Sequence, residues 1–124
     1  MARTYLFIGA VSGLLTVLLG VFGAHGLEAQ LPAQHLVWWH KAVDYQGLHS
    51  LALLATGLLA LQRSSGPLRL AGWSFLAGIL LFSGSLYLLS LTGQRSLGMI
   101  TPIGGLAFIT GWLGLALAAW RLPR

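Results

Sequence analysis

The sequence YLFIGAVSGLLTVLLGVFGA, residues 5–24, decides the fold class of this chain. It contains no Asp, Glu, Lys or Arg over its whole length. A helix needs roughly 20 mostly apolar residues to cross the hydrocarbon core of a membrane. The stretch therefore predicts a membrane-spanning helix. It is also longer than the apolar core of a typical signal peptide, so we expect it to remain as an uncleaved anchor.

Three further apolar stretches follow, at residues 45–62, 70–91 and 102–120, and none contains an Asp, Glu, Lys or Arg. The alternating pattern of a membrane β-barrel is absent. We predict an all-α integral membrane four-helix bundle in which residues 1–124 form a single domain. Residues 27–44 separate the first two predicted helices. Their mixture of aromatic and basic side chains favours an interfacial segment, or a backward extension of the second helix.

Composition supports a membrane location and excludes several classes of function. Hydrophobic residues make up 56% of the chain and charged residues 7%, whereas charged residues fill about a quarter of positions in soluble domains. The net charge of +5 comes from scattered residues rather than from a basic run, so nucleic acid is not an expected partner. The chain has no cysteine, which excludes disulfides and thiolate chemistry.

The distribution of basic residues predicts the orientation, because cytoplasmic loops carry an excess of Lys and Arg. Lys41 and Arg95 fall on one side of the predicted spans. The other basic residues fall on the opposite side, and they are Arg3, Arg63, Arg69, Arg121 and Arg124. We therefore predict that the N-terminus, the second connection and the C-terminus are cytoplasmic.

Small residues form continuous rows on two of the predicted helices. The first row is Gly9, Gly13, Thr16, Gly20 and Gly23. The row on the last helix is Gly104, Ala107, Gly111, Gly114 and Ala118. Membrane helices associate through such small faces and through interhelical hydrogen bonds. We expect both rows to pack inside one chain, the alternative being a homo-oligomer contact.

Polar side chains of all four helices are predicted to gather in the outer half of the bundle. They are His25, Asp44, Tyr45, Gln46, His49, Ser83, Ser85, Tyr87 and Thr101. Thr101, followed by Pro102, reads as the N-cap of the last helix. The cluster is interpreted as either a structural hydrogen-bond network or a site for a small ligand or lipid.

Asp44 and His49 are the two ionisable residues that need the closest weighing. Asp44 lies near the interface, where a negative charge in the first turn of a helix is favourable. His49 lies deeper and can either hydrogen-bond a neighbouring helix or relay protons. No metal site and no cofactor are expected, because His25 and His49 alone are too few ligands. Ser83 and Ser85 have no partner base within sequence reach, so the chain is not expected to be an enzyme.

Four motifs in order resemble a known family. They are GAHGL at residues 23–27, DYQ followed by His49 at residues 44–49, FSGSLY at residues 82–87 and TPIGG at residues 101–105. Together they resemble the YgdD-like family of small bacterial inner-membrane proteins, a group of unknown function. The resemblance implies four membrane helices and an inner-membrane location, and it implies no activity.

Two hypotheses of function follow. In the first, the chain is a non-enzymatic membrane protein that contacts lipids and uses the polar cluster for structure or for binding a small ligand or lipid. In the second, it is an oligomeric small transporter or channel, proton-coupled through His49 and Asp44.

Overall fold

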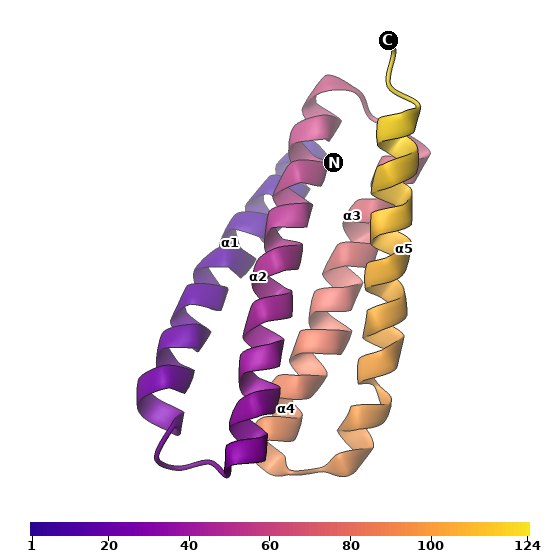
Figure 1. Ribbon diagram of the computed structural model, residues 1–124. Coiled ribbons are helices and arrows are strands. Elements are labelled where there is room, and N and C mark those ends of the chain that lie inside the picture. Colours follow the sequence, from indigo (N-terminus) through magenta and orange to yellow (C-terminus); the bar gives the residue numbers. More distant parts are fainter.

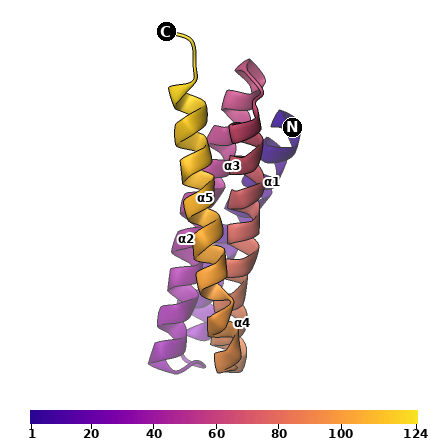
Figure 2. The ribbon, with the colours of Figure 1, turned by 90° about the vertical axis from the view of Figure 1, so that its right-hand side faces the viewer.

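The computed structural model describes residues 1–124 and contains only helices. The α-helices are α1 (Ala2–Phe22), α2 (Ala33–Gln62), α3 (Gly66–Gly78), α4 (Gly84–Thr92) and α5 (Thr101–Trp120). Two π-helical turns, η1 (Gly23–Leu27) and η2 (Ile79–Ser83), and a 3-10 helix, η3 (Arg95–Met99), extend or join them. Because η2 joins α3 to α4, the chain folds into four helical rods that lie side by side (Figure 1; Figure 2).

Three of the four rods are long and apolar enough to cross a membrane. They are Ala2–Leu27, Gly66–Thr92 and Arg95–Trp120. Helix α2 is longer than any other α-helix but less apolar, because Gln46, His49 and Ser50 lie within its otherwise apolar part. These three side chains are buried, so they lower the hydropathy of α2 without exposing polar groups on the outside of the protein.

The second helix begins at Ala33, twelve residues before the predicted start at residue 45. Residues 27–44 therefore do not form a separate segment. Leu27 ends the π-helical extension of α1, and residues 33–44 are the first turns of α2. The physical reason is that this part of α2 has its own packed face: Trp39 and Ala42, three residues apart, are both buried. Pro32, with ψ near 154°, marks the break before the helix.

Small residues allow the rods to pack in two tight pairs, α1 with α2 and α3 with α5. In the first pair, a Cβ added at Gly9 would lie 3.0 Å from the Leu54 side chain. In the second, a Cβ added at Gly114 would lie 2.8 Å from the carbonyl oxygen of Pro67. A Cβ added at Gly104 would lie still closer to backbone atoms of Phe82. Both rows of small residues are thus packed within the chain, with the exception of Gly13, where an added Cβ would meet no atom within 4 Å.

The two pairs are joined by contacts of α2 with α3, η2 and α4. The largest apolar core lies between three rods and consists of Tyr5, Ala52, Leu53, Ala71 and Phe75. Tyr5 also donates a hydrogen bond to the Arg69 carbonyl at 3.1 Å and packs against Gly72. This core fixes the end of α1 nearest the N-terminus against α2 and α3.

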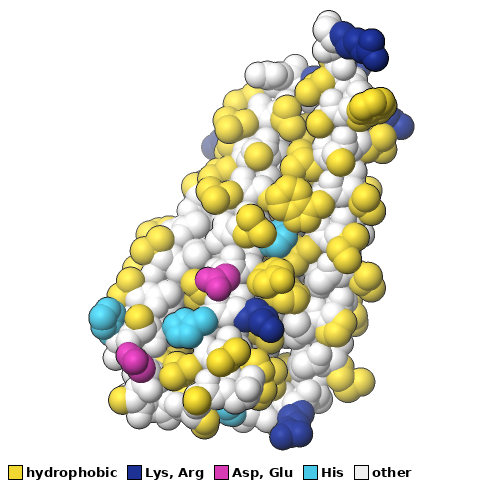
Figure 3. Space-filling model, in the orientation of Figure 1, with side chains coloured by type: hydrophobic (Ala, Val, Ile, Leu, Met, Phe, Trp, Pro, Cys, Tyr) yellow, Lys and Arg dark blue, Asp and Glu magenta, His cyan; other side chains and the backbone are white.

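The outer surface of the rods is apolar. Side chains such as Leu113, which is 67% exposed, and Leu106 point away from the protein along α5. Hydrophobic side chains are spread along the rods over the visible face (Figure 3). A surface with this much contiguous apolar area is not stable in water, so the fold predicts surroundings that are themselves apolar.

Polar connections lie at both ends of the rods. Both termini and the α2–α3 connection lie at the upper end in Figure 1, and the α1–α2 and α4–α5 connections lie at the lower end.

Helix α3 begins as the sequence indicates. Ser65 is its N-cap, the Leu68 amide donates to the Ser65 hydroxyl at 3.3 Å, and Pro67 occupies the first turn.

The close approach at Gly104 can be tested by adding one methyl group. We expect Gly104→Ala to lower the free energy of unfolding by about 1–3 kcal/mol, because its Cβ would overlap backbone atoms of Phe82 that cannot move independently. Gly13→Ala is the control, because no atom lies within 4 Å of the added Cβ and alanine favours a helix. Thermal unfolding in detergent measures both. Equal melting temperatures for the two variants would contradict the packing described here.

Candidate functional site

Helix α2 carries a buried polar face at the centre of the protein. Gln46, His49 and Ser50 are separated by three and four residues, so they lie on one side of the helix. Gln46 is 4% exposed and the other two are 2% exposed. The face divides into two parts, because Gln46 and Ser50 are bonded to α1 whereas His49 is bonded to α5.

The first part is a hydrogen-bond network around Gln46 that joins three rods. The Gln46 amide Nε2 donates to the Ser12 hydroxyl and the Ser12 carbonyl, each at 3.2 Å. Ser50 Oγ lies 2.6 Å from Ser12 Oγ. On the other side, the Tyr87 hydroxyl donates to Gln46 Oε1 at 2.5 Å. Gln46 therefore connects α2 to both α1 and α4 through side-chain hydrogen bonds.

An aromatic side chain covers one end of this network. Trp39 is buried, donates its indole N–H to the Leu19 carbonyl at 2.9 Å and packs edge-on against the Tyr87 ring at 4.7 Å. The Trp39 ring occupies the space that a Cβ at Gly23 would need. The first position of the GAHGL motif therefore requires glycine, because the Trp39 ring packs directly on it.

The second part is the His49 imidazole, whose two nitrogens are both occupied. Nδ1 lies 2.7 Å from the Tyr45 carbonyl, and Nε2 accepts a hydrogen bond from the Trp112 indole at 3.0 Å. Because a carbonyl only accepts, Nδ1 must carry the proton and the ring is neutral. The ring also stacks on Phe108 with centroids 3.5 Å apart. In this arrangement His49 has no free lone pair to bind a metal or take up a proton.

Two serines and Thr101 form separate contacts near the α4–α5 end. Ser83, in the π-helical turn η2, donates to the Ala42 carbonyl of α2 at 2.8 Å. The Ser85 and Thr101 hydroxyls lie 2.6 Å apart and join α4 to α5. Thr101 is the first residue of α5, and its side chain caps no backbone amide. The prediction that Thr101 is an N-cap is therefore wrong, because its hydroxyl is taken by Ser85.

Two of the predicted cluster residues do not join it. His25 and Asp44 are both exposed, on η1 and on the outer side of α2 respectively. Tyr45 is 41% exposed and takes part through its ring, which packs on Phe82 at 4.5 Å. No group of three or more His, Cys, Asp or Glu side chains lies close enough to hold a metal ion. The single predicted cluster is thus divided into the Gln46 network, the His49 contacts, and two separate contacts made by Ser83 and by Ser85 with Thr101.

Several residues that build these networks were missed by the sequence reasoning. They are Ser12, Trp39, Ser50, Phe108 and Trp112. Ser12 lies between Gly9 and Gly13, two members of the row of small residues. Ser50 follows Gln46 at the helical spacing of four. A tryptophan within an apolar segment needs an acceptor for its indole N–H, and that requirement was the available signal for Trp112.

A lateral groove of about 350 Å³ opens beside the Gln46 network, between α1 and the α3–α4 rod. Its walls are apolar, and polar side chains come only from the network. The lining residues are Phe7, Ile8, Val11, Ser12, Leu15, Leu19, Gln46, Leu76, Ile79, Leu80, Gly84 and Tyr87. The groove is therefore an apolar surface with a small polar patch, of the kind that suits a lipid or another apolar ligand.

The networks are complete as they stand. Every buried side-chain nitrogen and oxygen atom has a hydrogen-bond partner. The buried serines Ser50 and Ser83 donate to backbone carbonyls rather than to a base. The arrangement can hold helices together, and it contains no pair in which a nucleophile is activated by a base.

The Gln46–Tyr87 contact can be tested by a double-mutant cycle. We expect Tyr87→Phe and Gln46→Leu each to lower the free energy of unfolding by about 1–2 kcal/mol, because each leaves a buried polar group without a partner. The double variant should lose less than the sum. Thr110→Val is the control, since this exposed hydroxyl bonds only within its own helix. Strict additivity in the cycle would show that the two side chains do not interact.

Comparison with known proteins places this architecture in a family. A family described as "Protein of unknown function (DUF423)" matches residues 19–105. The chain is 48% identical over 118 residues to UPF0382 membrane protein YwdK of Bacillus subtilis, covering 94% of this chain and 96% of that protein. It is 44% identical over 120 residues to UPF0382 membrane protein SSP2132 of Staphylococcus saprophyticus, covering 97% and 99%.

A relative from a different group of bacteria is equally similar. A UPF0382 membrane protein of Haemophilus influenzae is 45% identical over 121 residues, covering 98% of this chain and 97% of that protein. No solved structure matches. The expectation of a membrane family of unknown function is confirmed at this level. The chain belongs to the DUF423 family, whose matched relatives are UPF0382 membrane proteins of unknown function.

Proposed function

We propose that this protein is a non-enzymatic, four-span protein of the bacterial inner membrane whose lateral groove binds the acyl chain of a membrane lipid. The internal polar networks hold the helices, and the groove between α1 and the α3–α4 rod is the binding surface. The observation that carries the proposal is the groove itself, an apolar hollow of about 350 Å³ that meets polar atoms only at Ser12, Gln46 and Tyr87.

The exposed character of the groove favours a lipid over a water-soluble ligand. Its walls include Val11 and Leu80, which are exposed on the same apolar surface that surrounds the rods. A ligand could enter sideways from the hydrocarbon phase without passing a polar layer. The polar floor is already satisfied by its own hydrogen bonds, so the ligand need supply no more than apolar surface.

The packing of α2 supports a four-helix membrane bundle. α2 packs against the α1 rod and the α3–α4 rod, and the three rods other than α2 each have the length and hydropathy of a membrane span. Its polar side chains face protein and are bonded to Ser12, Tyr87 and Trp112. A helix whose polar groups are paired inside a bundle can cross a membrane with them. We infer that α2 is the fourth span.

The charges support an orientation with both termini in the cytoplasm. The chain ends and the α2–α3 connection share one end of the rods. Five of the seven basic residues lie in these segments, and they are Arg3, Arg63, Arg69, Arg121 and Arg124. The excess of basic residues on one side favours that side for the cytoplasm. The motifs that resemble the YgdD-like proteins favour the inner membrane as the location.

The alternative of a proton-coupled transporter has no support in the geometry. It requires His49 and Asp44 to act together, but His49 is buried beneath Phe108 while Asp44 is exposed on the outer side of α2. Both His49 nitrogens are engaged. The rows of small residues, which could have formed contacts between copies, are used inside the chain. Lipids are therefore the partners we propose for the outer surface.

The orientation can be tested with single cysteines, because the natural chain contains none. In intact cells, we expect Ala29→Cys in the α1–α2 connection to react with a membrane-impermeant maleimide. Ser64→Cys in the α2–α3 connection should react only after the membrane is permeabilised. Both positions are exposed, so accessibility of the compartment decides the result. Labelling of Ser64→Cys in intact cells would refute the proposed orientation.

The groove can be tested by filling it. We expect Val11→Trp to reduce lipid retained by the purified protein roughly tenfold, because a bulky ring would occupy space that the acyl chain needs. Val17→Trp is the matched control. It lies on the same helix, is 63% exposed and does not line the groove. Native mass spectrometry at gentle activation measures the retained lipid, and thermal unfolding checks that both variants are folded.

The result decides whether the groove binds lipid or whether the networks beside it serve structure alone. If Val11→Trp retains lipid as well as Val17→Trp, the groove is not the binding surface and the networks serve structure alone. Gly84→Leu provides a second way to fill the groove, since the nearest atom to its added Cβ is 4.0 Å away. Loss of lipid in both filled variants, but not in the Val17→Trp control, is the outcome we expect.

A further inference from the structure

The two ends of the rods differ in charge, and the basic side chains at one end have no acidic side chains beside them. The chain has only two acidic residues, Glu28 and Asp44. Glu28 follows η1 at the α1–α2 end, and Asp44 lies in the half of α2 nearest that end. No carboxylate side chain is present at the end that carries the α2–α3 connection. The arginines there therefore have no acidic side chain to pair with.

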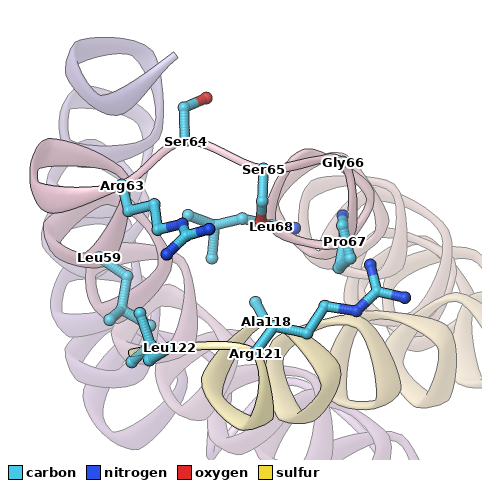
Figure 4. Close-up of a pocket in the computed structure, with 10 residues that line it drawn as sticks. All are labelled: Leu59, Arg63, Ser64, Ser65, Gly66, Pro67, Leu68, Ala118, Arg121 and Leu122. Atoms are coloured by element: carbon cyan, nitrogen blue, oxygen red, sulfur yellow. Dashed lines mark hydrogen bonds between the residues drawn. The ribbon is translucent and has the colours of Figure 1, made fainter. Parts of the chain in front are cut away.

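Two of these arginines border a single cavity. Arg63 follows the last residue of α2, and Arg121 follows the last residue of α5. They line a cavity of about 210 Å³ between the α2–α3 connection and the end of α5. Figure 4 shows the Arg63 and Arg121 side chains bordering this cavity; the Ser65 side chain on the connection points toward it, whereas the Ser64 side chain points away. Arg3 and Arg124, at the same end, do not line it.

The helix dipole accounts for part of this arrangement. Cations are favourable near helix C-termini, and both arginines follow one. The dipole, however, acts on each helix separately. It gives no reason for residues from the ends of two different helices to border one cavity together with hydroxyl groups. Because guanidinium is always charged and its planar donors match phosphate oxygens, the shared cavity favours a phosphate group.

The remaining lining residues distinguish a lipid from a free anion. Leu59, Leu68 and Leu122 lie in the same cavity as the two guanidinium groups. Ser65 adds a donor, because its hydroxyl accepts from the Leu68 amide and still has its own proton to donate. A ligand with a phosphate beside apolar surface uses the whole cavity, whereas an inorganic anion would leave the exposed surface of Leu59 and Leu122 without a partner.

We propose that Arg63 and Arg121 form a site for the phosphate of an anionic phospholipid headgroup at the end of the bundle that holds the termini. The site rests on the membrane placement proposed above and is separate from the lateral groove. It lies at the ends of the helices, where headgroups meet the protein. A lipid bound there ties the α2–α3 connection to the end of α5, two segments that no ion pair joins within the chain.

The test uses the full chain, delipidated in a neutral detergent, and native mass spectrometry with added phosphatidylglycerol or phosphatidylcholine. We expect the natural chain to bind phosphatidylglycerol preferentially. The preference should fall roughly tenfold in R63Q/R121Q, which removes both guanidinium groups. R3Q/R124Q is the matched control, because it removes two charges from the same end and leaves the cavity intact. The control should keep the preference.

Each other outcome overturns the proposal in a distinct way. An equal loss in R3Q/R124Q would show a diffuse basic surface rather than a site. Displacement of the lipid by an equal concentration of inorganic phosphate would show a site for a soluble anion. No preference in the natural chain would remove the site altogether. Val11→Trp, which fills the groove, should leave the headgroup preference unchanged, so failure of the groove proposal is distinguishable from failure of this one.

Discussion

The need to pair polar groups in an apolar environment is the constraint on which the rest of this structure depends. α2 carries Gln46, His49 and Ser50 into the centre of the protein. An unpaired polar group there costs several times what a good hydrogen bond contributes, so each side chain requires a fixed partner. Their partners are Ser12 on α1, Tyr87 on α4 and Trp112 on α5. Satisfying α2 therefore fixes the positions of all the other rods.

The small residues make these hydrogen bonds geometrically possible. Gly9 and Gly23 bring α1 against α2, and Gly104 and Gly114 bring α5 against the α3–α4 rod. α2 and α5 are not a closely packed pair, and the His49–Trp112 bond spans the space between them. Close packing thus sets two helix pairs, while the polar face of α2 and the apolar core around Phe75 join the pairs. Membrane helices are generally held by these same two kinds of contact.

The complete hydrogen bonding of the interior also bears on function. The hydrogen bonds of the centre are complete within the chain, so the places left for a ligand lie at its margins. Two such places are the apolar groove beside α1 and the arginine cavity at the α2–α3 end. Both present chemistry that a phospholipid carries, an acyl chain in one case and a phosphate in the other. The interior of the protein has no unpaired polar groups, and its outer hollows match the acyl chain and the phosphate of a phospholipid. These features favour a role in which lipids are the ligands.

The sequence by itself determined the helical class, the three helices that are long and apolar enough to cross a membrane, and the charge difference between the ends of the rods. These features depend on local properties, namely the length of apolar runs and the order of basic residues along the chain. It also indicated which small residues face a neighbour, because their spacing follows the helical repeat. For residues 27–44 it left two alternatives open, an interfacial segment or a backward extension of the second helix. The structure has the extension from Ala33 onward, because the first turns of α2 form a packed face when Trp39 meets Gly23 and Tyr87.

Only the tertiary structure decided how the polar residues are grouped. The sequence places His25, Asp44 and His49 at similar heights, but it cannot say which side of a helix faces which neighbour. The structure turns Asp44 outward and His49 inward. It also recruits Ser12 and Trp112, which have no polar neighbours in sequence. Hydrogen-bond partners such as His49 and Trp112, which are 63 residues apart, are set by helix packing, and packing is a property of the whole fold rather than of any segment.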